Sequence, residues 1–542
     1  MIDIWGGVEE ISPTRKIYRF FTGLWYNGRN GGEVMRNLSK LVFQRVVGVS
    51  LSILLQLAAM LVFVDWLAEY QQWFGALMTA LRIFFTVFLV TGRTNPAYKI
   101  AWLLLILPFP VAGVSLYLFL GGNRLSRWEK KRLTGLAAAL VGEQREREET
   151  RLQLESTHAG AARQSRYLKK YAYSPLVGGT KTEYFPCGED CFPRMLEDLK
   201  TAEKYIFLEY FIVEEGKMWG SILEILTEKA RQGVDVRLIY DDFGCIRRLP
   251  ARYSRELKDL GISARAFNPF VPVVSGRLNN RDHRKLMIVD GKIGYTGGIN
   301  LADEYINEGS RFGYWKDAGL RLEGPGVWSM TVQFLAMWNY LHGTAADPAA
   351  YRPKLAEYTA GGFVQSFGDM PLDGEAVGET ALLNLINGAE KSVFIMTPYL
   401  VLDDKMTAAL SGAAKRGLDV RIVTPGIPDK WYVYAVTRAN YPALLEAGVK
   451  IYEFAPGFLH SKVFLADGST AVVGTVNLDF RSLYLHFENA VWMHGADCIR
   501  QIGEDFEKTF PRCRHVTLSA VQATPWYVRL GRRLLHLLAP LM

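Results

Sequence analysis

Two segments of the chain repeat the same polar residues at the same spacing. In each, a histidine is followed by a lysine two residues later, an aspartate seven later, a glycine fourteen later and an asparagine seventeen later. The members of the two copies are, in order, His283, Lys285, Asp290, Gly297 and Asn300, and His460, Lys462, Asp467, Gly474 and Asn477. One short match is a weak signal, but two copies in register indicate a single functional site.

The spacing predicts that each copy is a hairpin with its polar groups gathered at one end. Residues two apart in a strand point to the same face, so the histidine and the lysine lie together. The Asp-Gly pair marks a turn, after which a second apolar strand ends at the asparagine. Imidazole, ammonium and carboxamide groups at one spot suit a phosphate, because two of them can hold its oxygens while the third does chemistry.

The repeat extends beyond these motifs and predicts the fold class. Residues 204–213 parallel 391–401, and each segment is followed by a helical stretch and a second strand. This strand–helix–strand order indicates α/β lobes with largely buried sheets. We therefore expect two lobes, at 176–345 and 346–525, each a mixed sheet flanked by helices, and we expect them to meet face to face.

The two motifs resemble the paired HKD motifs of the phospholipase D superfamily, and the surrounding sequence is similar to that of bacterial cardiolipin synthases. The similar segments are Leu-Glu209-Tyr-Phe, Tyr-Asp241-Asp242, Gly297-Gly298-Ile-Asn300, Trp315-Lys-Asp317, Thr397-Pro-Tyr399 and Asn477-Leu-Asp479-Phe-Arg481-Ser482. This resemblance implies phospholipase D-like lobes that transfer a phosphatidyl group.

The resemblance also implies roles for the motif residues. His283 is then the nucleophile that attacks the phosphodiester, and His460 protonates the departing glycerol and later takes the proton from the incoming hydroxyl. The groups that hold the phosphate oxygens are Lys285, Lys462, Asn300 and Asn477. No metal and no cofactor is expected, because the lysines supply the charge that a cation would otherwise provide.

Four carboxylates accompany the histidines. Asp317 and Glu488 each stand just before an apolar strand downstream of a motif. A carboxylate bound to the far ring nitrogen of a histidine fixes its tautomer and raises its basicity. The resemblance supports an acid at this place, so we expect Asp317 to orient one histidine and Glu488 the other. Asp290 and Asp467 complete the catalytic motifs, and we expect them to hold the hairpin turns.

An apolar region before the lobes predicts an N-terminal helical transmembrane region within 1–122. A basic segment at 1–45 is followed by apolar runs at 46–64, 73–91 and 101–120. The first run has no charged residue over a length that matches one bilayer crossing. Three such runs favour a membrane anchor over buried core helices.

Basic residues before the first run and after the third indicate an even number of crossings, with both lobes on the cytoplasmic face of the cell membrane. One run, either the second with Arg82 or the third with Pro108 and Pro110, is therefore expected to be re-entrant or interfacial. Residues 123–175 predict a charged helical connector. Residues 526–542 suit either an amphipathic helix on an anionic membrane or a helix packed on the second lobe.

Composition narrows the class of partner. The chain has 542 residues, a net charge of +8 and a pI near 9.0, which favour anionic lipid headgroups or nucleic acid. The apolar runs argue against a nuclease, and the two intact motifs argue against an inactive scaffold. Five scattered cysteines form no disulfide framework and indicate a reducing compartment. Cys187 and Cys191 are a lone Cys-x3-Cys pair and only a weak zinc signal.

Taken together, the sequence favours a multi-pass cardiolipin synthase that joins two phosphatidylglycerols and releases glycerol. A phosphatidylserine synthase or a phospholipase D with the same two-histidine chemistry is the alternative, because the motifs do not select the acceptor hydroxyl. The expected partners are phosphatidylglycerol and anionic membrane lipids rather than nucleic acid, and the oligomeric state stays open. Five positions depart from the usual residues of the family without removing a catalytic group: Asp282, Ala318, Gly319, Thr475 and His486.

Overall fold

The computed structural model describes residues 71–92, 94–121, 146–269, 279–309, 311–342, 348–355 and 358–541, with a few positions between 54 and 62. The predicted basic segment, most of the first apolar run and the first part of the connector therefore lie outside the described residues. The chain divides into two compact units, 1–57 with 271–273 and 58–270 with 274–542. Both lobes and the helices that precede them belong to the second unit.

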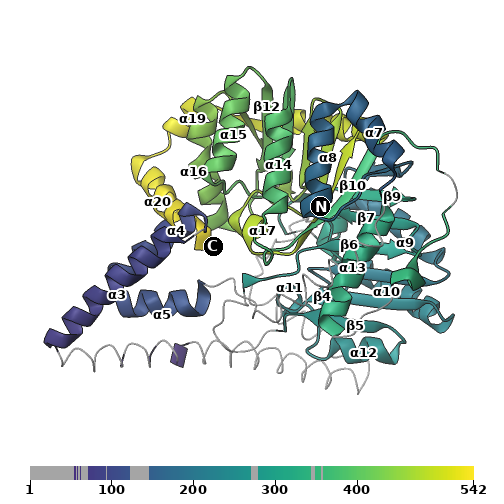
Figure 1. The fold of residues 1–542 in the computed structure, drawn as a ribbon, viewed down its shortest axis with the longest axis horizontal. Coiled ribbons are helices and arrows are strands. Elements are labelled where there is room, and N and C mark those ends of the chain that lie inside the picture. The colour runs from purple at the N-terminus through teal and green to yellow at the C-terminus, as the bar shows by residue number, and fades with distance from the viewer. Residues whose placement is uncertain are drawn as a thin grey trace, which may run out of the picture. The chain divides into compact units, whose positions relative to one another are not determined.

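The first lobe is built on a seven-stranded sheet of order β2-β9-β7-β6-β3-β4-β5 (Figure 1). Its strands are β2 (Lys181–Phe185), β3 (Tyr205–Tyr210), β4 (Asp235–Asp241), β5 (Ser263–Phe267), β6 (Lys285–Val289), β7 (Ile293–Gly297) and β9 (Gly319–Glu323). The neighbours β3, β4 and β5 run parallel and the remaining pairs are antiparallel, so the sheet is mixed. Its helices are α9 (Gly188–Lys200), α10 (Lys217–Arg231), α11 (Asp242–Cys245), α12 (Tyr253–Asp259) and α13 (Val327–His342).

The second lobe is built on a nine-stranded sheet of order β1-β10-β17-β16-β15-β11-β12-β13-β18. Its strands are β1 (Val177–Gly178), β10 (Phe363–Asp369), β11 (Ser392–Met396), β12 (Asp419–Pro425), β13 (Lys450–Phe454), β15 (Val463–Ala466), β16 (Thr470–Gly474), β17 (Glu488–His494) and β18 (Cys513–Val516). Its helices are α14 (Val377–Gly388), α15 (Asp404–Lys415), α16 (Trp431–Glu446), α17 (Phe480–Tyr484), α18 (Ile499–Thr509) and α19 (Leu518–Gln522).

The two sheets share one topology. The order β9-β7-β6-β3-β4-β5 in the first lobe corresponds strand for strand to β17-β16-β15-β11-β12-β13 in the second. The internal repeat predicted from the sequence is therefore confirmed as two α/β lobes of mixed sheet. One strand breaks the chain order, because β1 lies within the range expected for the first lobe and precedes every strand of the first sheet, but it pairs with β10 at the edge of the second sheet.

The lobes share a hydrophobic core. One cluster of buried side chains takes Phe207 and Leu286 from the first sheet and Leu465 and Val491 from the second. Burial on both faces explains why β6 reads as an uninterrupted apolar run after Lys285 rather than as an alternating pattern. A short parallel pair also crosses between lobes, joining β8 (Tyr314–Lys316) to β14 (Gly457–Leu459).

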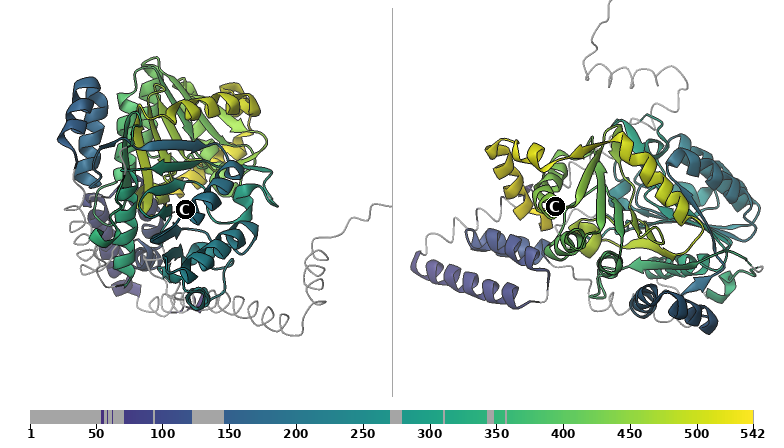
Figure 2. Two further views of the ribbon diagram at one scale, coloured as in Figure 1. Left: turned by 90° about the vertical axis from the view of Figure 1, so that its right-hand side faces the viewer. Right: turned by 90° about the horizontal axis from the view of Figure 1, so that it is seen from above.

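The remaining connector helices, α7 (Glu148–Thr157) and α8 (Ala159–Tyr171), lie along one flank of the second lobe (Figure 2). Leu154, Ala162 and Leu168 on these helices are buried in the core of that lobe. This part of the predicted connector is thus packed against the second lobe through its apolar side chains.

The apolar region contains three helices, α3 (Gln71–Thr91), α4 (Pro96–Ile106) and α5 (Pro110–Leu120). No helix in the described part of the chain is both long and apolar enough to cross a membrane, so the transmembrane expectation is not confirmed. The third apolar run is divided between α4 and α5 at the Pro-Phe-Pro segment, the feature that made this run a candidate for a re-entrant or interfacial segment. Each of these helices has 11 residues, about 16 Å at 1.5 Å per residue.

The three helices pack on one another. The Arg82 guanidinium in α3 donates a hydrogen bond of 3.0 Å to the Leu107 carbonyl, which is left without a helical partner between α4 and α5. In α5, Gly113 lies so close to α4 that a Cβ there would be 2.6 Å from the Ile106 Cα atom. Only glycine therefore allows this close approach.

The start of α4 is bound to the second lobe. Asn95 caps the helix by accepting a hydrogen bond from the Ala97 amide, while its own amide donates to the Asp403 carboxylate at 3.0 Å and the Tyr484 hydroxyl at 2.9 Å. Tyr98 stacks edge-on against Phe480, with ring centroids 5.8 Å apart. Since α17 contains Phe480 and Tyr484, the apolar helices are held beside the segment that leads to Glu488.

The C-terminal segment forms α20 (Trp526–Leu537), which packs against α16 of the second lobe. This agrees with the second of the two predictions made for residues 526–542. The helix also keeps a row of exposed apolar side chains: Trp526, Tyr527, Leu530, Leu534 and Leu537.

Candidate active site

Each motif forms the predicted hairpin, β6 with β7 and β15 with β16. Asp290 and Asp467 stand at the turns with positive φ values of 52° and 54°, each followed by a glycine. The Asp290 carboxylate accepts backbone hydrogen bonds from Glu203, Lys204 and Tyr205 at 2.8–2.9 Å. Asp467 does the same for the equivalent amides of the second lobe. These two carboxylates therefore fasten each hairpin to the start of a neighbouring strand.

Each motif histidine is bound by an acid of the opposite lobe. His283 Nδ1 lies 2.9 Å from Glu488 Oε2, and His460 Nδ1 lies 2.6 Å from Asp317 Oδ2. Backbone hydrogen bonds also connect the two lobes here: the His283 amide donates to the Phe487 carbonyl, and the His460 amide donates to the Lys316 carbonyl. The pairing leaves Nε2 of both imidazoles for chemistry, and neither lobe can form this arrangement alone.

Burial and paired charges set the protonation of these groups. Burial lowers the pKa of His283 to about 3 and that of His460 to about 4, against the opposing pull of Glu488 and Asp317. Burial would raise the pKa of each acid, but the partner histidines hold both pKa values below their usual range. Without a bound anion, both imidazoles are therefore neutral at pH 7, with Nδ1–H donated to a carboxylate.

The two lysines lie beneath the histidines. Lys285 Nζ donates to the His283 carbonyl at 2.6 Å, and Lys462 Nζ donates to the His460 carbonyl. Both side chains are fully buried, and burial lowers the pKa of Lys285 to about 7 and that of Lys462 to about 8. Each ammonium has three protons, so after this one bond it keeps donors for an anion.

The two asparagines, which correspond in sequence, differ in their contacts. Asn300 accepts a hydrogen bond from the Ile212 amide at 3.0 Å and donates one to the Tyr305 hydroxyl at 2.7 Å. Asn477 is also buried, but its side-chain oxygen has no hydrogen-bond partner among the residues that the structure describes. Asn477 is thus the more available of the two for a ligand.

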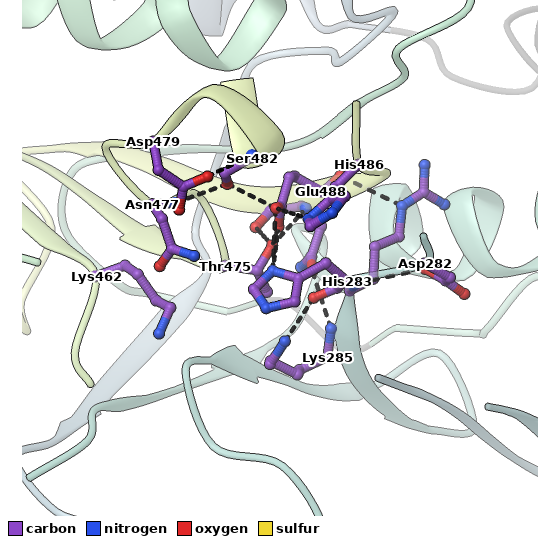
Figure 3. A network of polar contacts seen from close by, with 12 residues as sticks. Asp282, His283, Lys285, Lys462, Thr475, Asn477, Asp479, Ser482, His486 and Glu488 are labelled. Atoms are coloured by element: carbon purple, nitrogen blue, oxygen red, sulfur yellow. Dashed lines mark hydrogen bonds and ion pairs between the residues drawn. The ribbon is translucent and has the colours of Figure 1, made fainter. Parts of the chain in front are cut away.

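Two hydroxyl groups that the sequence analysis missed bind Glu488. Ser482 Oγ donates to Glu488 Oε1 at 2.6 Å, and Thr475 Oγ1 donates to Oε2 (Figure 3). Thr475 stands where the first motif has Gly298, and a Cβ at Gly298 would lie 1.9 Å from Asp317 Oδ1. The departure at Thr475 therefore has a physical reason: its hydroxyl supports Glu488, whereas Asp317 leaves no room for a side chain. A signal was present in the sequence, since Thr475 breaks the repeat.

A cavity of about 770 Å³ opens over the histidines. Its lining includes both motif histidines and both motif asparagines. It also includes basic residues, namely Arg248, Arg281, Arg311, Lys430 and Arg481. Acids lie on the same walls, namely Glu214, Glu304, Asp429 and Asp479, and the first three pair with Arg248 and Lys430. A cavity of this size with convergent polar groups and further guanidinium groups suits an anionic ligand such as a phosphodiester headgroup.

One group of side chains in the cavity has the composition of a cation site. Single ligand atoms of His283, His486 and Glu488 lie within 4.8 Å of one another. Cys187 and Cys191 do not belong to this group, since the Cys187 thiol donates to Asp190 at 3.1 Å and Cys191 is buried in the core of the first lobe. The expectation that the chemistry needs no metal stays a prediction.

The lowered pKa values of the lysines predict an alkaline limit to activity. As the pH rises through 7 to 8, Lys285 and Lys462 of the free enzyme lose their charge, and an anionic phosphodiester binds more weakly. We expect kcat/KM to fall about tenfold between pH 7 and 9, with kcat changing less, because a bound phosphate restores the charged form. Initial rates over this range test the prediction, and a flat kcat/KM profile would contradict it.

Each lobe supplies an acid that orients the motif histidine of the other lobe. Two lobes of this topology with their histidines paired in this way define the two-histidine phospholipase D class of enzymes. The family model described as "Cardiolipin synthase, PLD-like domain" matches residues 195–309 and 382–510, and the one described as "Phospholipase_D-nuclease N-terminal" matches 78–122. A protein named "Cardiolipin synthase" from a Geobacillus species is 35% identical over 489 residues, covering 87% of this chain and 95% of its own. The chain belongs to the cardiolipin synthase family and is a phosphatidyltransferase.

Two further comparisons show how far the similarity to other proteins extends. An uncharacterized protein from Streptococcus mutans is 44% identical over 460 residues, covering 84% of this chain and 99% of its own. Among solved structures, a phosphatidylserine synthase from Haemophilus influenzae aligns with a TM-score of 0.55 at 13% identity, covering 70% of this chain and 99% of its own. That likeness shows the fold alone.

Proposed function

We propose that the protein is a membrane-bound cardiolipin synthase that transfers a phosphatidyl group from one phosphatidylglycerol to another and releases glycerol. The observation that carries this proposal is the pair of crossed contacts, His283 with Glu488 and His460 with Asp317, with both histidines lining one cavity. The relatives named as cardiolipin synthases, which match nearly the whole length of the lobes, support the choice of substrate.

In the first half-reaction, Nε2 of neutral His283 attacks phosphorus, and the bond from phosphorus to the glycerol oxygen breaks. His460 gives its proton to that oxygen, so free glycerol leaves and a phosphatidyl group stays on His283. A bound phosphodiester anion stabilises the protonated form of His460, which burial otherwise disfavours. Lys285 and Lys462 hold the phosphate oxygens, and Asn477 adds a contact by donating a hydrogen bond from its Nδ2.

In the second half-reaction, a glycerol hydroxyl of another phosphatidylglycerol gives its proton to His460, and its oxygen attacks phosphorus. The bond between phosphorus and His283 then breaks, which forms cardiolipin and restores both histidines. Every proton is returned in each cycle. One phosphodiester replaces another, so the overall change in free energy is small and the reaction is reversible.

We also propose that the protein binds the cell membrane as a multi-pass protein with its lobes on the cytoplasmic face. The exposed apolar side chains of α3 and α20, which include Trp73, Phe84, Val87, Trp526 and Leu534, support contact with lipid. Labelling of a cysteine introduced on α8 by a membrane-impermeant reagent tests the side, since labelling in intact cells would contradict a cytoplasmic location.

The acceptor is tested with purified enzyme in bilayers whose only phospholipid substrate is phosphatidylglycerol. We expect cardiolipin and free glycerol in nearly equal amounts, with phosphatidic acid as a minor product, and we expect added glycerol to drive the reaction backward. Predominant phosphatidic acid would identify a phospholipase D instead. Absence of cardiolipin until serine is added would identify a phosphatidylserine synthase.

A further inference from the structure

Two corresponding side chains cover the two motif histidines but differ in chemistry. Trp315 and His486 each stand two residues before an orienting acid, Asp317 or Glu488. The Trp315 ring lies 5.5 Å from the His460 ring, and the His486 ring lies 5.6 Å from the His283 ring, at similar tilts of 48° and 42°. Each motif histidine is therefore covered by a ring at a similar distance and tilt, but the ring at His460 is an indole and the ring at His283 is an imidazole.

Trp315 is fixed in place yet has an unused hydrogen-bond donor. Its backbone amide donates to Asn307 Oδ1 at 2.7 Å, its carbonyl accepts from Asn307 Nδ2 at 3.0 Å, and it pairs with Phe458 across the lobes. The side chain is only 7% exposed. Its Nε1 is buried without a hydrogen-bond partner in the described part of the chain. A buried tryptophan N–H usually has a partner, and because Trp315 lines the catalytic cavity, a ligand in that cavity can supply the acceptor.

The surroundings of this donor are aromatic. Around the His460 ring, the rings of Tyr305, Trp315 and Phe458 lie at 5.6, 5.5 and 5.7 Å, and Phe312 packs against Trp315 and Phe458. These four side chains line the catalytic cavity. Such walls exclude loosely held water and strengthen any hydrogen bond made inside them. On the other side, the His283 ring meets Phe211 and His486.

We propose that Trp315 Nε1 donates a hydrogen bond to a hydroxyl oxygen of the glycerol headgroup and so presents that alcohol, rather than water, to His460. The inference rests on the proposed function, in which the departing glycerol and the acceptor hydroxyl both occupy the His460 side of phosphorus. Trp315 is thus a positioning residue that selects the acceptor. The step itself is unchanged: the hydroxyl proton goes to His460, the new oxygen–phosphorus bond forms and the bond to His283 breaks.

The test measures how the phosphatidyl group divides between glycerol and water. The parent enzyme is given phosphatidylglycerol and radiolabelled glycerol, and labelled phosphatidylglycerol is compared with phosphatidic acid at increasing glycerol concentration. Trp315→Phe keeps an aromatic ring but removes the N–H. We expect the ratio of labelled phosphatidylglycerol to phosphatidic acid at a given glycerol concentration to fall about tenfold, as for the loss of one buried hydrogen bond.

The matched control is Trp328→Phe. Trp328 Nε1 is also buried without a partner among described residues, but it lines a separate cavity with Arg147 and Tyr358. Trp328→Phe should leave the division between glycerol and water unchanged. If Trp315→Phe leaves it unchanged while the parent makes cardiolipin, the role of Trp315 is wrong and the proposed function stands. If the parent itself transfers only to water, the proposed function and the inference both fail.

A second substitution distinguishes the loss of the N–H group from a folding defect in Trp315→Phe. Placing 3-benzothienylalanine at position 315 keeps the shape of the bicyclic ring and replaces N–H by sulfur. If this variant shows the same tenfold loss of preference for glycerol, the hydrogen bond from Trp315 is supported. If the folded variant keeps the preference of the parent enzyme, the proposed hydrogen bond is wrong.

Discussion

Replacing His283 or His460 by alanine is expected to lower turnover by about 10³-fold or more, with the protein still folded and membrane-bound. Nucleophile and acid act as one unit, so the double variant should be no more than a few-fold slower than either single variant. Cardiolipin formation per enzyme checks this. Retention of more than a tenth of the parent rate in either variant would refute the two-histidine assignment.

His494→Ala is the matched control. His494 is 7% exposed, as His283 and His460 are, but its Nδ1 shares a hydrogen bond with Thr470 on the second sheet and it does not line the catalytic cavity. We expect this variant to keep kcat. A covalent label from phosphatidylglycerol carrying a radiolabelled acyl chain should be absent from His283→Ala, and its presence there would assign the nucleophile to His460.

Glu488→Gln and Asp317→Asn should each lower kcat by about 10²-fold or more with little change in fold. The neutral amide no longer favours the tautomer with Nδ1–H, nor does it stabilise the charged imidazole of the opposite lobe. Because Glu488 holds His283 and Asp317 holds His460, each substitution impairs a histidine that belongs to the other lobe. Steady-state rates and the pH dependence of kcat check the effect.

Glu453→Gln controls for the burial of an acid. Glu453 is 1% exposed and binds Arg438 at 2.8 Å in the second lobe, but it does not line the catalytic cavity. Its substitution should lower the melting temperature and leave kcat within about threefold. If Glu488→Gln showed the same pattern, a lower melting temperature with kcat nearly retained, Glu488 would be structural.

Much of the fold follows from local pattern. Short-range spacing encodes the strands, the turns at Asp290 and Asp467, and the order of elements in each half. Because the sequence repeats, each of these elements could be recognised in both halves of the chain. The joining of β1 to the second sheet had no such signal, because a two-residue strand carries no periodicity and its partner β10 is far away in sequence. The break between α4 and α5 was marked by Pro108 and Pro110, but hydropathy alone shows one continuous apolar run across these prolines.

The candidate site, too, could be predicted from the sequence only in part. Asp317 and Glu488 could be found because each stands next to an apolar strand downstream of a motif. That each acid binds the histidine of the other lobe depends on how the two lobes dock, which no local pattern records. In the sequence alone, Trp315 cannot be distinguished from an ordinary aromatic residue of the core. Its unpaired N–H becomes visible only when the partner of every buried donor is known.

The crossed contacts also decide when activity can begin during synthesis. Glu488 lies 205 residues after His283, so at ribosomal rates His283 waits about 10 to 40 s for its acid after it has been made. A first lobe that folds early still has an imidazole with neither fixed tautomer nor general acid. A truncated chain that ends before β17 is therefore inert toward the lipids around it, and nascent enzyme cannot hydrolyse the membrane in which it is being assembled.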